Sequence, residues 1–122
     1  MIAANIEPIL VLTGAVTAIA VGQFFAPAQF LRLAYGEAPA DPVSVALARH
    51  GGLLIFCVGV LLIYAAFRPP VRMPVMVFAF VEKVAFAACV LGTPLRRRRV
   101  AAAMAAADLL MAVVYGLYLA GL

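Results

Sequence analysis

Charged residues are scarce in this chain of 122 residues, where they make up 11% of the sequence against 68% for hydrophobic residues. Soluble globular domains contain roughly 45–50% apolar residues. The composition therefore excludes a water-soluble fold. A chain of this length also has room for only one domain, which we assign to residues 1–122.

Cysteine and histidine are also scarce, and tryptophan is absent. Cys57 and Cys89 lie in separate apolar runs without CxxC spacing, which argues against a disulfide framework and a zinc site. His50 is the only histidine, so a metal centre or a haem with two protein ligands would lack a second strong ligand. The sequence has no glycine-rich phosphate loop. We therefore predict no metal and no cofactor.

The net charge of +4 depends largely on one short basic run, Arg96 to Arg99. Nucleic-acid binding needs basic side chains spread along a face with polar and aromatic groups between them. Four arginines in one loop are too few and too local for that, so we predict no nucleic-acid partner. Instead, the charge indicates how the chain is oriented in a membrane.

Four long apolar runs dominate the sequence, and each is close to the roughly 20 residues that cross a hydrocarbon core as a helix. They predict an all-α fold, an integral membrane four-helix bundle. The spans are expected at about 8–26, 43–67, 73–93 and 100–120. Residues 27–36 mix aromatic, aliphatic and basic side chains, which predicts a short interfacial helix after the first span.

Arginine in the connections predicts the topology of the bundle. The first and third connections hold Arg32 and Arg96 to Arg99, five charges, whereas the second holds Arg68 and Arg72. Short loops rich in Lys and Arg stay on the cytoplasmic side. Both termini are therefore predicted to be periplasmic, in a bacterial inner membrane.

Five ionisable residues fall inside the predicted spans: Arg49, His50, Glu82, Lys83 and Asp108. Each would cost about 2.5–3.5 kcal/mol if it faced lipid at the bilayer centre. Counted from the cytoplasmic ends of the spans, His50, Glu82 and Asp108 lie at similar depths. We therefore expect all five to meet in one charge-balanced layer, with Arg49 and Lys83 opposite the two carboxylates.

Small residues recur at helical spacing in two of the spans. The seam in the first span consists of Gly14, Ala18 and Gly22, with Thr13 and Thr17 available for hydrogen bonds to another helix. The stripe in the last span consists of Ala101, Ala105, Asp108, Ala112 and Tyr115. Such seams are typical of close helix packing and are compatible with a homo-oligomer.

The polar layer is open to three interpretations. In the first, the layer fixes the packing of the helices in a binding or accessory protein and contacts membrane lipids or a small apolar ligand. Alternatively, His50 and Glu82 act as acid and base on a lipophilic substrate, with Tyr115 donating a hydrogen bond to it. The third interpretation is a small proton-coupled transporter.

Part of the chain resembles the small four-helix DoxX-like membrane proteins and related domains of unknown function. The residues that carry the resemblance are Phe30, Tyr35-Gly36, Asp41-Pro42, Arg49-His50-Gly51, Leu53, Leu54 and Glu82-Lys83. The resemblance implies a bundle with an interfacial segment after its first span, and it transfers no catalytic residue. Small multidrug-resistance transporters fit less well because the first span here is uncharged, and membrane sterol isomerases fit less well because tryptophan is absent.

Overall fold

The computed structural model describes residues 2–122, so that of the predicted domain only Met1 lies outside the described residues. Within that range the chain is all-α, with six α-helices, two short 3₁₀ helices and no strand. In chain order the elements are η1 (Ala3–Asn5), α1 (Ile6–Ala18), α2 (Val21–Phe25), α3 (Pro27–Tyr35), α4 (Pro42–Ala66), α5 (Pro69–Leu91), η2 (Pro94–Arg97) and α6 (Arg99–Leu119). The predicted all-α four-helix bundle is confirmed.

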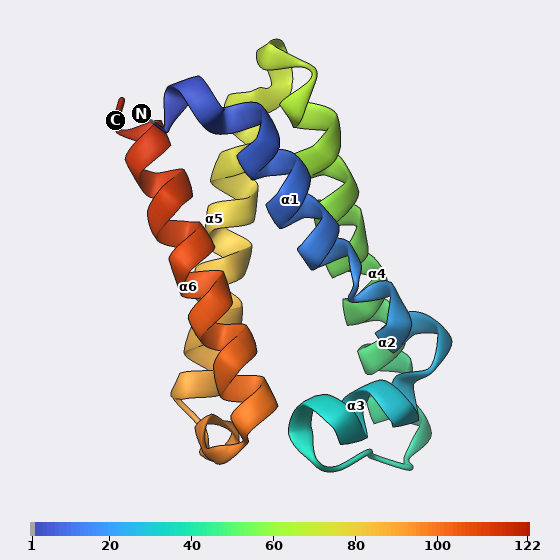
Figure 1. Cartoon of the computed structure of the whole chain (residues 1–122). Coiled ribbons are helices and arrows are strands. Elements are labelled where there is room, and N and C mark those ends of the chain that lie inside the picture. The colour runs from blue at the N-terminus through green and yellow to red at the C-terminus, as the bar shows by residue number, and fades with distance from the viewer. Residues whose placement is uncertain (1) are drawn as a thin grey trace.

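Four segments are long and apolar enough to cross a membrane: Ala3–Phe25, Pro42–Ala66, Pro69–Leu91 and Arg99–Leu119. The chain is therefore an integral membrane protein. The start of the described chain, at η1, lies next to the end of α6 at one end of the bundle, and α3 lies at the opposite end (Figure 1).

Prolines and capping groups set the ends of these helices. The Asp41 carboxylate accepts a hydrogen bond from the Ser44 amide at 2.8 Å and starts α4, and hydrogen bonding by Ser44 lowers the pKa of Asp41. α5 begins at Pro69, four residues before the predicted span, because prolines in a first turn need no amide hydrogen bond. The Arg72 guanidinium donates to the Ala65 and Ala66 carbonyl oxygens at 3.1 and 2.7 Å, satisfying the last turn of α4.

The helices pack as two close pairs, α1 with α4 and α5 with α6. Glycines bring the first pair together: a methyl group on Gly59 would lie 2.6 Å from the Ala18 amide nitrogen, and one on Gly14 would lie 2.7 Å from the Gly59 carbonyl oxygen. Alanines do the same for the second pair, since Ala79, Ala87, Ala101, Ala105 and Ala112 are all buried. The small residues thus pack within the chain.

The two pairs share a core at only one end of the bundle. Near the termini, a cluster that includes Leu10, Leu62, Met76 and Tyr115 joins all four spans. Toward α3, the buried cluster is Ala87, Val90, Ala101 and Ala105, which belong to α5 and α6 alone. The pairs diverge toward that end, and α3 lies beneath the space between them (Figure 1).

Gly59→Ala should destabilise the fold, because the new methyl group would meet backbone atoms of α1 that cannot move without separating the helices. We expect the free energy of unfolding in mild detergent to fall by about 1–3 kcal/mol. Gly51→Ala is the matched control on the same helix, since the nearest atom to its methyl group is a side-chain nitrogen at 3.8 Å. Equal losses for the two variants would show that α1 and α4 are not in backbone contact.

Candidate functional site

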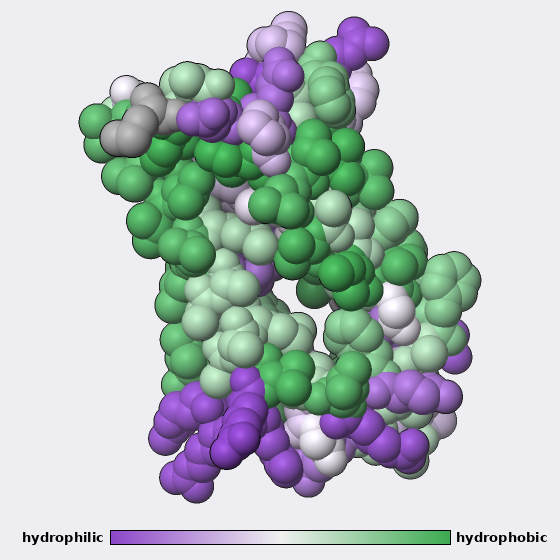
Figure 2. Space-filling view, in the orientation of Figure 1, coloured by the Kyte–Doolittle hydropathy of each residue, from purple (hydrophilic) through white to green (hydrophobic). Residues whose placement is uncertain are grey.

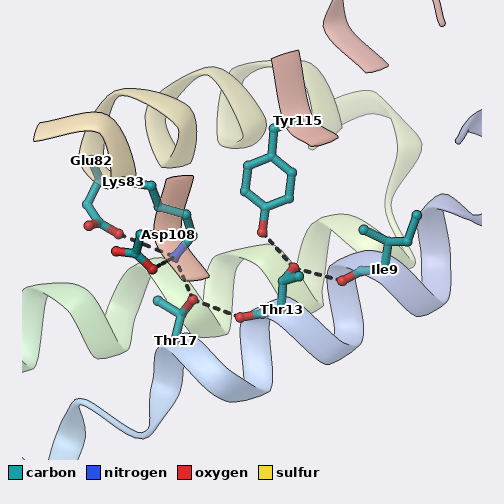
Figure 3. Close-up of polar contacts among 7 residues, drawn as sticks. All are labelled: Ile9, Thr13, Thr17, Glu82, Lys83, Asp108 and Tyr115. Atoms are coloured by element: carbon teal, nitrogen blue, oxygen red, sulfur yellow. Dashed lines mark hydrogen bonds and ion pairs between the residues drawn. The ribbon is translucent and has the colours of Figure 1, made fainter. Parts of the chain in front are cut away.

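Lys83, the only lysine of the chain, lies in the interior of the bundle with its side chain 1% exposed. Its Nζ donates to Thr17 Oγ1 of α1 at 2.8 Å and to Asp108 Oδ1 of α6 at 3.3 Å. Glu82 Oε1 lies 3.9 Å from the same nitrogen, close enough for an ion pair but too far for a hydrogen bond. One amine thus connects α5 to α1 and α6 (Figure 3).

Two threonines and a tyrosine extend this cluster along α1. Tyr115 donates its hydroxyl hydrogen to Thr13 Oγ1 at 2.6 Å, and Thr13 Oγ1 donates to the Ile9 carbonyl oxygen at 2.7 Å. Thr17 Oγ1, which accepts from Lys83, donates to the Thr13 carbonyl oxygen at 2.7 Å (Figure 3). The two threonine hydroxyls therefore act both as donors and as acceptors, as buried polar groups in lipid require.

A cavity of about 300 Å³ lies directly against the polar cluster, on the side where the helix pairs diverge. Thr17, Glu82, Lys83 and Asp108 form its polar wall. Its remaining wall is largely apolar and includes Val16, Phe30, Leu33, Ile55, Phe86 and Met104. The space-filling view shows the opening, with apolar surface around most of its rim (Figure 2). An apolar space with a few convergent polar groups is typical of a small-molecule site.

Arg49 and His50 lie outside this cluster, so the expectation of five groups in one layer is corrected to three. Both residues are exposed, and the Arg49 guanidinium donates to the Phe24 carbonyl oxygen at 3.1 Å. The His50 side chain makes no hydrogen bond or ion pair with another residue in the range 2–122, and neither side chain lines the cavity. The predicted meeting of His50 with Glu82 as an acid–base pair therefore does not occur.

The register of α4 explains this correction. Gly52 and Gly59 face α1 and α2, where added methyl groups would meet Ala20 and Ala18. His50 precedes these glycines by two and nine residues, and at about 100° per residue each interval is close to half a turn. His50 therefore lies on the opposite face of α4, away from the interior.

The correction also changes the charge balance, because Arg49 was expected to offset one carboxylate. Among the residues that line the cavity, Lys83 is the single basic group and Glu82 and Asp108 are the acidic ones. Glu82 Oε1 is buried and has no hydrogen-bond partner among residues 2–122. A buried acceptor without a donor costs about 1–3 kcal/mol, so this atom is a local weakness of the fold.

Two further cavity residues, Gln23 and Tyr35, were not among the predicted site residues. Gln23 Nε2 donates to the Ala48 carbonyl oxygen at 2.6 Å and ties α2 to α4. Tyr35, at the end of α3, is half-buried, and burial together with the Asp108 carboxylate raises the pKa of its hydroxyl. The sequence offered one signal for each residue. Gln23 is a polar amide at the end of an otherwise uncharged span, and Tyr35 is an aromatic residue in the segment that was predicted to lie at the membrane surface.

No family model, curated protein or solved structure matches the chain. Function must therefore be inferred from the cluster and the cavity themselves.

Asp108→Asn should destabilise the bundle more than Glu82→Gln, because Asp108 accepts a hydrogen bond from Lys83 whereas Glu82 accepts none. We expect Asp108→Asn to lower the free energy of unfolding by about 1.5–3 kcal/mol, the range for hydrogen bonds to charged groups. Glu82→Gln should cost less than half as much. Denaturant titration of the purified protein in detergent measures both, with Glu7→Gln on the exposed start of α1 as a control. A larger loss for Glu82→Gln would contradict the assigned pairing.

Proposed function

We propose that this membrane protein binds a small lipid-like or apolar molecule in the cavity between its two helix pairs. The hydrocarbon part of the molecule lies against the apolar wall, and its polar end lies at the cluster around Lys83. The observation that carries this proposal is the junction of an apolar cavity with an ionisable cluster inside the spans. A cluster that served only to hold the helices together would need no adjoining space.

Access from the bilayer supports the same function. Four apolar side chains of the cavity wall are also strongly exposed, as in a cavity that is open at its side: Val16, Ile19, Leu33 and Val100. They belong to the first span, α3 and α6, where the two helix pairs diverge. A molecule dissolved in the membrane reaches the cavity through this side without crossing water.

Binding fits the structure better than acid–base chemistry by His50 and Glu82, because Glu82 lines the cavity whereas His50 faces away from it. We keep the bacterial inner membrane and the periplasmic termini as part of the proposal, and they rest on the arginine-rich connections at the α3 end. On that orientation the cavity lies in the cytoplasmic half of the bilayer. The resemblance to DoxX-like proteins is compatible with this function but does not specify it.

A single tryptophan can report occupancy of the cavity, since the chain has none of its own. Phe86→Trp places the reporter in the cavity wall, and Phe78→Trp places it on the same helix at a side chain that is 62% exposed. In nanodiscs, a dibrominated octanol should quench the first tryptophan saturably. It should quench the second only in proportion to its concentration in the lipid.

Filling the cavity should remove the saturable part of this quenching. Ala107 lines the cavity, so Ala107→Leu in the Phe86→Trp background adds side-chain volume at the binding site. Ala106→Leu is the matched control, because Ala106 is exposed and does not line the cavity. Quenching that is linear in both reporters, or saturable quenching that persists in Ala107→Leu, would contradict the proposed function.

A further inference from the structure

The Glu82 carboxylate is the one acidic group of the cluster that accepts no hydrogen bond from residues 2–122. Its Oε1 is buried, accepts no hydrogen bond from residues 2–122 and lies 3.9 Å from the Lys83 amine. That amine already donates to Thr17 and Asp108 at shorter distances. The Glu82 side chain also forms part of the cavity wall. Oε1 itself is closed to the cavity, but the side chain is 17% exposed as a whole and neither of its oxygens accepts a hydrogen bond from residues 2–122. A donor in the cavity can therefore pair with the carboxylate through its accessible part.

The charges around the cavity indicate which charge that donor should carry. Two carboxylates face the cavity and one amine opposes them, so one negative charge is left over when all three groups are ionised. No arginine lines the cavity to correct this: Arg49 binds the Phe24 carbonyl oxygen, and Arg98 lies against Gly36 at the end of α3. An uncompensated charge in a low-dielectric site is strongly unfavourable.

We infer that the molecule bound in the cavity is a small lipophilic cation, a primary alkylammonium, whose N–H groups donate to Glu82. This inference rests on the proposed function and specifies the chemistry of its ligand. The ammonium supplies both missing features at once, a hydrogen-bond donor for the Glu82 carboxylate and a positive charge for the extra carboxylate. The alkyl chain lies against Phe86, Met104 and Phe30. A cavity of about 300 Å³ is at the lower limit for ligand pockets, which favours a short chain.

Three ligands of equal chain length separate charge from hydrophobicity. Octylammonium, octanol and octanoate are each titrated at neutral pH against the dibrominated octanol, in Phe86→Trp protein held in nanodiscs of zwitterionic lipid. The same titrations are made with Glu82→Gln, with Glu82→Met as a second variant that removes the acceptor without adding an amide. Glu7→Gln is the control, because it removes a carboxylate from the exposed start of α1. Comparing variants in one lipid cancels the partitioning of each ligand into the bilayer.

Octylammonium should displace the probe most tightly, and Glu82→Gln and Glu82→Met should weaken it at least about tenfold, the effect of one charge-assisted hydrogen bond. Octanol should change much less in these variants, and all three ligands should be unaffected by Glu7→Gln. If octanol or octanoate displaces the probe as well as octylammonium does, or if neither Glu82 variant weakens octylammonium, the inference is overturned while the binding function stands. Absence of saturable quenching by the probe itself overturns the proposed function as well.

Discussion

The structure depends on neutralising one lysine in the interior of a membrane bundle. Lys83 is almost fully buried, and its amine reaches a hydroxyl on α1 and a carboxylate on α6. An unpaired ammonium inside the hydrocarbon is costly, so the three helices must keep the positions that satisfy it. The bond from Lys83 to Thr17 links the two helix pairs, whereas its contact with Asp108 lies within the α5–α6 pair. Glycine and alanine provide the close packing inside each pair.

The position of this link explains why a cavity forms beside it. On the side of the termini, a core that includes Leu10, Leu62 and Tyr115 joins all four spans. On the side of α3, the buried cluster belongs to α5 and α6 alone, and α1 and α4 remain a separate pair. Lys83 and its partners lie at the boundary, so their polar atoms form one wall of the space that the diverging pairs enclose. The packing contacts and the cavity wall therefore share the same residues.

The depth of each ionisable residue in the bilayer could be predicted from the sequence, but the direction in which its side chain leaves the helix could not. Counting residues along the spans placed Glu82, Lys83 and Asp108 at compatible levels, and the structure brings them together. The same counting included His50, which fails because the glycines of α4 fix the opposite face against α1 and α2. The four spans follow from apolar length and proline positions. The cavity could not be predicted in this way. It arises because the two helix pairs diverge, and residues far apart in the sequence contribute to that divergence.

The most direct test uses the fact that Lys83 is the only lysine. Solid-state NMR in lipid bilayers, with lysine labelled in its side-chain nitrogen and aspartate in its carboxyl carbon, reports whether the two groups are in contact. The account predicts a strong dipolar coupling between them that persists in Asp41→Asn, disappears in Asp108→Asn and involves an amine protected from exchange with water. A lysine nitrogen without coupling to aspartate, or one that exchanges freely with water, would contradict it.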